Sequence, residues 1–178
     1  PAYHHASGLR TRFPAGKKKD IRAAMTVDVG SPAPDFTMPT DGGGSVTLSA
    51  LRGKPVVLYF YPKDDTSGCT SEACGFRDQL PDFSAVDAVV IGVSKDSVAS
   101  HDKFKAKHEL TFTLASDTDG AVCEAYGTWV EKSMYGRKYM GIDRATFLID
   151  KDGVVRNVWR KVKVTGHVAA VLKAVQAL

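Results

Sequence analysis

The sequence predicts an α/β fold in which a mixed β-sheet carries helices on both faces. Two continuous apolar runs, "PVVLYFY" (55–61) and "AVVIGVS" (88–94), are typical of strands buried on both faces. Helical patterns alternate with these runs, and a β-hairpin and a last helix follow them. This order of elements favours a mixed sheet over an all-β or all-α arrangement. The 178 residues, 43% hydrophobic and 25% charged, suit one compact domain.

The N-terminal part of the domain predicts a β-hairpin. "VGSPAPDF" (29–36) has two prolines, which predict an extended segment before the hairpin. The three glycines of 42–44 suit a turn, and the segment 46–48 suits a short strand after it. No Lys-Ser/Thr pair follows these glycines, so the segment does not predict a phosphate-binding loop.

The middle of the chain alternates strands and helices. Residues 66–80 predict a helix that starts among Ser, Thr and Gly and ends at Pro81, because proline interrupts helical hydrogen bonding. An amphipathic helix is expected over 97–110, a short strand over 112–117, and a short helix that ends at Gly127.

The last third predicts a hairpin and a terminal helix. Two β-runs in 144–160 are separated by Asp-Lys-Asp-Gly, a strong turn signal, and apolar residues recur at helical spacing over 166–178. The preceding segment is rich in aromatic residues, for which packing in the core or lining of a pocket is expected. These residues are Trp129, Met134, Tyr135 and Tyr139.

The positive charge is concentrated in residues 1–24, which hold six Lys and Arg residues against one Asp. Three interpretations remain open for this segment: a disordered extension, a non-native segment before a start at Met25, or an Arg-rich targeting peptide. Residues 25–178 form the predicted single domain. Their near-neutral charge argues against nucleic-acid binding, and no uncharged stretch exceeds ten residues, which argues against a membrane span. A cytoplasmic protein is expected, or an organellar one if the basic segment is a targeting peptide.

Cys69 is the strongest nucleophile candidate. It follows a buried strand and lies in the first turn of the predicted helix, where unpaired N–H groups and the helix dipole stabilise a thiolate. The Thr66 hydroxyl, three residues earlier, is placed to bond either the sulfur or a substrate oxygen. Three cysteines in a chain of this length do not predict a disulfide framework, so a reducing compartment and transient pairing are expected.

Cys74 lies five residues after Cys69. Along an intact helix this spacing gives a rise of about 7.5 Å and side chains about 140° apart, beyond the reach of a disulfide. A bond between them therefore requires the helix to unwind, and Gly75 weakens the helix there by about 1 kcal/mol relative to alanine. A peroxide would oxidise the first thiolate to a sulfenic acid, which a second thiol resolves, and Cys74 fits that resolving role.

Other interpretations of these cysteines are less well supported. A buried inert cysteine is the usual case, but Cys69 sits among polar turn residues. A zinc site would need further ligands at knuckle spacing, and a thioredoxin-type disulfide oxidoreductase would need a CxxC pair, both of which the sequence lacks. A redox-gated binding or chaperone-like protein remains as an alternative from another class.

The segment "YFYPKDDTSGCTSEACGFRD" resembles the active-site segment of the peroxiredoxins. Their signature Pro-x-x-x-Thr/Ser-x-x-Cys is matched by Pro62, Thr66 and Cys69. The continuation Thr/Ser-x-Glu-Ala-Cys, ending at Cys74, is similar to the bacterioferritin-comigratory, or Q-type, subfamily. The resemblance extends through "VVIGVSKDS", "SDTDGAVCEAYGTW" and "MYGRKYMGIDRATFLIDKDG" to cover essentially all of the chain from Gly30 onward.

The resemblance implies a thioredoxin-like fold and reduction of hydrogen peroxide and organic hydroperoxides by Cys69. It implies an intramolecular disulfide with Cys74, recycled by thioredoxin or a similar thiol reductant, in a monomer. No motif of the sequence itself predicts a flavin, a haem or a metal. It also assigns Arg144 to the active site, where a guanidinium would favour the thiolate and hold the peroxide oxygens. Pro62, which lacks an N–H, would wall the pocket against water.

For several residues a structural role is expected. Cys123 is predicted to pack in its short helix, and His101, His108 and His167 are predicted to be solvated or capping residues. Glu72 leaves two alternatives open, a cap of its own helix or a member of a polar network with Arg144.

Overall fold

The computed structural model describes residues 27–178. The basic segment 1–24 lies outside the described residues, so its three interpretations stay untested. Within the described residues, no helix has the length and apolar character needed to cross a membrane.

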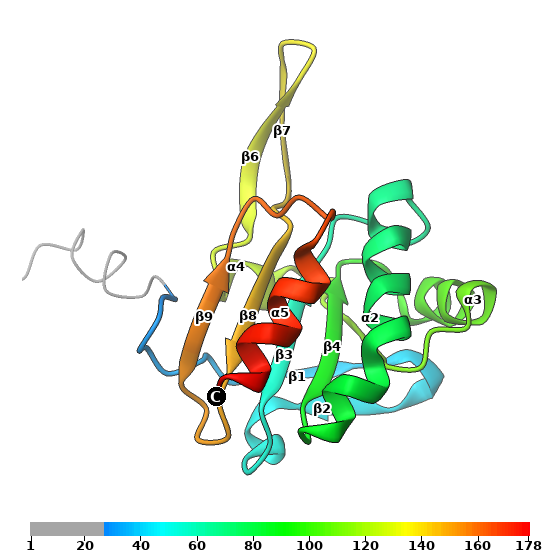
Figure 1. Ribbon diagram of the computed structural model, residues 1–178. Helices are drawn as coiled ribbons and strands as arrows, with labels where there is room; N and C mark the ends of the chain where they lie inside the picture. The colour runs from blue at the N-terminus through cyan, green and yellow to red at the C-terminus, as the bar shows by residue number, and fades with distance from the viewer. Residues whose placement is uncertain (1–26) are drawn as a thin grey trace, which may run out of the picture.

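A five-stranded mixed sheet forms the centre of the molecule (Figure 1). The central strand β3 runs parallel to β4 and antiparallel to β8, while β5 and β9 form the two edges. The strands are β3 (Val56–Phe60), β4 (Val89–Ser94), β5 (Thr113–Ser116), β8 (Ala145–Ile149) and β9 (Val155–Trp159). The predicted mixed sheet is confirmed.

The side chains of β3 explain why the sheet has two covered faces. All five residues of β3 are buried, and successive side chains point to opposite faces. Val57 and Tyr59 join the core cluster beneath α2 and α5, whereas Leu58 and Phe60 join the cluster on the other face. The continuous apolar run is thus the signature of a strand with a core on each side.

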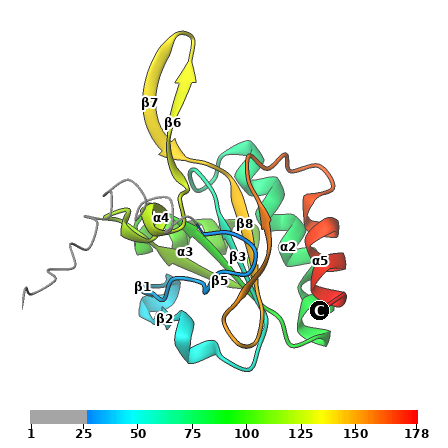
Figure 2. The same cartoon turned by 90° about the vertical axis from the view of Figure 1, so that its left-hand side faces the viewer.

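Helices and a small hairpin cover these two faces (Figures 1 and 2). On one face lie α2 (Ser67–Ala85) and α5 (His167–Gln176); on the other lie α4 (Ala121–Ala125) and the hairpin of β1 (Thr37–Pro39) and β2 (Ser45–Thr47). The helix α3 (Val98–His108) packs along the edge strand β5, and the 3-10 turns are η1 (Asp41–Gly43) and η2 (Leu48–Leu51). Helices on both faces and the N-terminal hairpin are confirmed.

The predicted end of α2 at Pro81 is wrong. The helix continues through this proline to Ala85. Phe76 and Phe83, on either side of the proline, are both fully buried against the sheet. Their burial holds the helix together across a position where proline removes one hydrogen bond.

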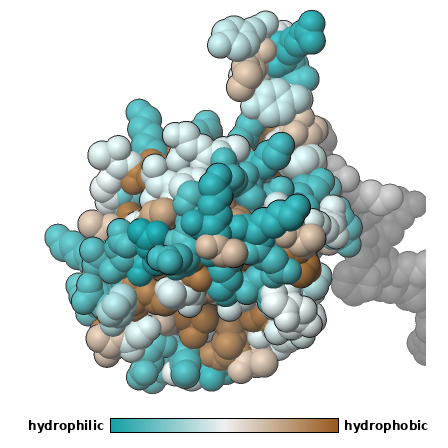
Figure 3. Space-filling view, turned by 90° about the vertical axis from the view of Figure 1, so that its right-hand side faces the viewer, coloured by the Kyte–Doolittle hydropathy of each residue, from teal (hydrophilic) through white to brown (hydrophobic). Residues whose placement is uncertain are grey.

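The aromatic segment after α4 is a second correction. It forms an antiparallel hairpin, β6 (Trp129–Met134) and β7 (Arg137–Ile142), which stands clear of the body (Figures 1 and 3). Tyr135 and Gly136 have φ of 52° and 77°, the pair of positive values that a tight two-residue turn requires. Trp129 packs on the core as predicted, but Met134, Tyr135 and Tyr139 are 56%, 99% and 44% exposed, so core packing is wrong for them.

The close approach of β3 and β4 generates a testable prediction at Gly92. This glycine pairs with Tyr59, and a Cβ placed on it would lie 2.8 Å from the Tyr59 ring, which is fully buried and stacked on Phe76. Gly92→Ala should therefore lower the free energy of unfolding by about 1–3 kcal/mol, measured by urea denaturation.

Gly141→Ala is the matched control, because a Cβ on this strand glycine would lie 3.3 Å from both the Lys132 side chain and the Tyr139 ring, which is 44% exposed in the projecting hairpin and can move aside. It should change stability by no more than about 0.5 kcal/mol. Equal losses in the two variants would contradict the packing of the Tyr59 ring described above.

Candidate active site

Cys69 lies in the first turn of α2, at the end of the loop that leaves β3. Cys69 is 1% exposed and packs with Tyr59 of β3 and with Tyr61, which follows that strand. As the third residue of the helix, it is among the positions whose N–H groups have no helical acceptor. The structure therefore places Cys69 in the first turn of the helix, at the positive end of the helix dipole, where the sequence predicted it.

Arg144 reaches the same sulfur from the neighbouring strand. The antiparallel register places Ala145 opposite Phe60, so the residue before β8 lies beside the loop that follows β3. Arg144 Nη2 donates a hydrogen bond to Cys69 Sγ at 3.3 Å. A Cβ on Gly68 would lie 3.1 Å from this nitrogen, so the glycine leaves the space that the guanidinium occupies.

Glu72, one turn after Cys69 on the same helix, completes a buried ion pair with Arg144. Arg144 Nη1 donates to Glu72 Oε1 at 2.7 Å, and the Glu72 side chain is fully buried. Of the two alternatives, the structure therefore favours the polar network over a helix cap. Burial raises the pKa of Glu72 to about 7, against the opposing influence of Arg144. Its second oxygen, Oε2, has no hydrogen-bond partner among residues 27–178.

His167 extends this network, and its prediction as a solvated or capping residue is wrong. Its side chain is 4% exposed, and Nε2 lies 2.7 Å from Thr146 Oγ1 and 4.0 Å from Glu72 Oε2. Burial, followed by the charge of Arg144, lowers the pKa of His167 to about 4, so its ring is neutral at neutral pH. The sequence held a signal for this: His167 and Val171 are four residues apart and share the buried face of α5.

Thr66 and Pro62 occupy the loop before α2. Thr66 is the N-cap residue, and its hydroxyl donates to the Lys63 carbonyl at 2.9 Å. Since its hydrogen is used there, its oxygen is left as an acceptor for a group outside the helix. Pro62 is exposed, and its expected role as a wall of the pocket stays a prediction.

Cys74 lies on α2 more than one turn after Cys69, and both cysteines are free thiols in an intact helix. Cys74 is half-buried. Beside it, Gly75 lets α2 approach α5, because a Cβ on Gly75 would lie 3.0 Å from Val168 Cγ2. The glycine thus has a packing role in addition to the lower helix propensity inferred from sequence.

The third cysteine is structural, as predicted. Cys123 is fully buried in α4, and its N–H donates to Asp117 Oδ2 at 2.7 Å. Burial, reinforced by Asp117, raises the pKa of the Cys123 thiol far above its ordinary value. A thiol that stays protonated is a poor nucleophile.

The prediction for His101 is also wrong. His101 is fully buried and lies 2.7 Å from Asp64 in the loop before α2. Its position three residues after Val98 and three before Phe104 places it on the inner face of α3, which the sequence could have indicated. His108 is partly exposed at the end of the same helix and pairs with Asp65.

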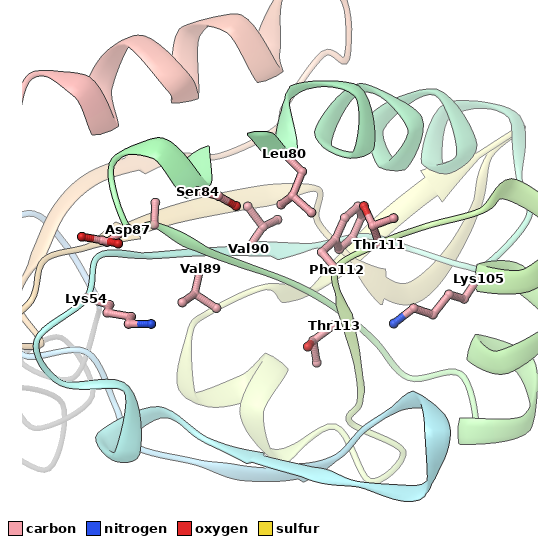
Figure 4. A pocket seen from close by; sticks show the side chains of 11 residues that line it. Lys54, Leu80, Ser84, Asp87, Val89, Val90, Lys105, Thr111, Phe112 and Thr113 are labelled. Atoms are coloured by element: carbon pink, nitrogen blue, oxygen red, sulfur yellow. The ribbon is translucent and has the colours of Figure 1, made fainter. Parts of the chain in front are cut away.

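A cavity of about 450 Å³ lies elsewhere on the molecule, beside the edge strand β5 (Figure 4). Lys54 and Lys105 flank it, and Leu80, Val90 and Phe112 lie between them. None of the predicted site residues lines this cavity. Among the described residues, no group of three or more His, Cys, Asp or Glu side chains is arranged to hold a metal ion.

Comparison with known proteins gives a consistent result. The model of the AhpC/TSA family matches residues 29–158. The chain is 58% identical to putative peroxiredoxin bcp of Coxiella burnetii over 148 residues, 83% of this chain and 98% of that protein. It is 51% identical to peroxiredoxin Bcp of Bacillus subtilis, over 85% of this chain and 97% of that protein.

Solved structures agree with this result. The bacterioferritin comigratory protein of Xanthomonas campestris, described for its alkyl peroxide reduction activity, superposes with a TM-score of 0.79 at 46% identity. The match covers 85% of this chain and 96% of that one. A PrxQ mutant from Xylella fastidiosa gives a TM-score of 0.81 at 41% identity, with the same coverage. The predicted thioredoxin-like fold is confirmed.

The buried imidazole predicts how stability responds to acid. The pKa of His167 is about 4 in the folded chain and ordinarily 6.5. The contribution of its neutral ring to the free energy of unfolding is therefore complete above pH 6.5 and is lost as the pH falls toward 4. His167→Gln removes this pH dependence. As the pH falls from 6.5 to 4, the free energy of unfolding of the variant should therefore rise by up to about 3 kcal/mol relative to that of wild type. Urea denaturation from pH 7.5 to 4 measures the difference; a constant difference would contradict a buried neutral ring.

Proposed function

Because the chain belongs to the AhpC/TSA family and is a peroxiredoxin, a thiol peroxidase, we propose that Cys69 reduces hydrogen peroxide and organic hydroperoxides and that Cys74 resolves the oxidised sulfur. The observation that carries the proposal is the 3.3 Å hydrogen bond from Arg144 to Cys69 Sγ at the start of α2. A charged donor and a helix N-terminus both favour the thiolate over the thiol.

The first step is a displacement at oxygen. The Cys69 thiolate attacks the terminal oxygen of ROOH, an S–O bond forms, and the O–O bond breaks with its electron pair on the leaving RO⁻. The alkoxide takes a proton to leave as ROH, or as water when the substrate is hydrogen peroxide. Cys69 is left as a sulfenic acid.

Arg144 and Thr66 support this step from two sides. The guanidinium is fixed by Glu72, so it offers its donors to the reacting oxygens without the cost of reorganisation. The Thr66 oxygen, whose own hydrogen is bonded to Lys63, accepts a hydrogen bond from the peroxide O–H. Free N–H groups of the first turn of α2 stabilise the charge that develops on the leaving oxygen.

The second step forms the disulfide. The Cys74 thiol attacks the Cys69 sulfenic acid, an S–S bond forms, and water leaves. Both residues lie in one continuous helix, so the first turns of α2 unwind before the sulfurs meet. A thioredoxin-type dithiol then reduces the exposed disulfide by thiol exchange. A monomer suffices for the cycle, because both cysteines belong to one chain.

Removing the attacking sulfur provides the first test of this function. In a coupled assay with a thioredoxin system, Cys69→Ser should lower peroxide turnover to background, because a serine hydroxyl is not ionised at neutral pH. Cys123→Ser is the matched control and should keep most of the activity, since that thiol is buried and protonated. Turnover that survives in Cys69→Ser would refute the proposal.

Removing the second sulfur tests resolution. Cys74→Ser should still consume one equivalent of peroxide but should fail to be recycled by thioredoxin. Peptide mass mapping of wild type after one equivalent of peroxide should find Cys69 joined to Cys74. A bond between Cys69 and Cys123 would refute Cys74 as the resolving residue.

A further inference from the structure

The loop between β3 and α2, residues 61–66, is docked on α3 by two adjacent carboxylates. Asp64 contacts Ser100 and His101 of this helix, and Asp65 contacts Lys107 and His108 at 2.7 and 2.9 Å. The loop carries Thr66, and Cys69 follows it directly. The position of the proposed active site therefore depends on a helix that contributes no group to the chemistry described above.

The inner contact is a fully buried pair. The side chains of His101 and Asp64 are 0% and 4% exposed, and His101 Nδ1 lies 2.7 Å from Asp64 Oδ2. On the other side of the ring, Nε2 lies 3.0 Å from the carbonyl oxygen of Ala115 in β5. A carbonyl oxygen can only accept, so Nε2 carries a hydrogen.

The groups around Asp64 favour a donor role for Nδ1. Tyr61 donates its hydroxyl to Oδ1, and Ser100 donates to Oδ2 at 2.8 Å. These donors converge on both oxygens and favour an ionised Asp64, which accepts a hydrogen bond from Nδ1 as well. A ring that donates from both nitrogens is an imidazolium, and the buried contact is a charged pair.

The charges that face His101 agree with this assignment. They come from Asp64 in the loop before α2 and Asp96 in the loop before α3, and the hydroxyl of Tyr61, which follows β3, is the neighbouring titratable group. Burial alone lowers the pKa of His101, but the hydrogen bond and charge of Asp64 outweigh it and leave the pKa above 6.5.

Further hydrogen bonds fix the rest of the loop between Asp64 and Thr66. The Asp64 N–H donates to Asp96 Oδ2 at 2.8 Å, and Asp96 is itself held by the Ser94 hydroxyl at the end of β4. Asp65 has a positive φ of 60°, which is unfavourable for a residue other than glycine unless side-chain contacts compensate. Thr66 is tied to the carbonyl of Lys63, the residue before Asp64.

We propose that His101 is a positioning residue of the peroxidase, whose imidazolium holds Asp64 and thereby fixes Thr66 and the first turn of α2 for attack by Cys69. The inference rests on the proposed function. It adds to the proposed active site a residue of α3 that does not contact the Cys69 sulfur. It also predicts that the rate of Cys69 oxidation depends on the protonation of this residue. Because the pKa of His101 is raised, the anchor is complete below pH 6.5 and is lost as the pH rises through the pKa of the folded chain.

The test replaces the charged pair with a neutral one. In Asp64→Asn/His101→Gln, hydrogen bonds remain possible but the charge is gone. Stopped-flow measurement of Cys69 oxidation should give a rate constant about tenfold below wild type at pH 6. The ratio of wild type to variant should fall toward one as the pH rises through the pKa of His101 in the folded chain, which lies above 6.5, because the wild-type ring then loses its proton.

A matched control separates positioning from general stability. Tyr126→Phe removes a buried hydrogen bond to Pro34, outside the active-site loop, and should leave the rate constant unchanged although it lowers the melting temperature. Nitrogen-15 NMR of the histidine rings provides a direct measurement: His101 should show two ring N–H signals at pH 6.

The outcomes distinguish this inference from the proposed function. The rate of alkylation of Cys69 by iodoacetamide, quantified on its peptide, should differ between wild type and the double variant by the same ratio as the rate of oxidation by peroxide. If wild type consumed no peroxide but the alkylation ratio held, the proposed function would fail and the positioning role would stand. A neutral His101 ring, a ratio that does not change with pH, or an equal loss of rate in Tyr126→Phe would overturn the inference.

Discussion

The guanidinium of Arg144 joins the three parts of the molecule on which the proposed chemistry depends. It bonds Cys69 at the start of α2 and Glu72 one turn later, and it comes from the residue just before β8, the strand next to the one that leads into that helix. The pair with Glu72 is fully buried on the carboxylate side, where breaking it would leave an uncompensated charge. The guanidinium therefore has little freedom to turn away from the sulfur.

The same helix that presents Cys69 keeps Cys74 apart from it. An intact α2 holds the two side chains more than a turn apart, and α5 packs on the helix at Gly75. The fold thus favours a state in which the first sulfur meets substrate before it meets its proposed partner. Resolution needs a second, locally unwound state, whose cost includes separating α2 from α5 and Glu72 from Arg144.

Most of the elements and the position of Cys69 could be predicted from the sequence, because buried strands and a helix start are local patterns. It placed Cys69 at the start of a helix without any knowledge of its neighbours. Arg144 was different: nothing in its local sequence distinguishes it from an exposed arginine, and only the family resemblance singled it out. Its contact with Cys69 spans 75 residues of sequence and is created by the pairing of β3 with β8.

The misjudged residues fail for related reasons. His101 and His167 are polar residues on buried helix faces, and their partners, Asp64 and Thr146, come from distant elements that no periodicity reveals. Met134 and Tyr135 are apolar by composition, yet the positive φ values at the Tyr135-Gly136 turn carry them into solvent. In each case the tertiary environment outweighed the average preference of the residue type.

The central claim is that oxidation of Cys69 by peroxide leads to unwinding of α2. Hydrogen–deuterium exchange of peptides from residues 66–85, compared before and after one equivalent of peroxide, tests it most directly. The account predicts faster exchange in the first turns of α2 after oxidation, while the central strand β3 keeps its protection. Unchanged protection of α2 in a sample whose Cys69–Cys74 disulfide is verified by mass would contradict the account.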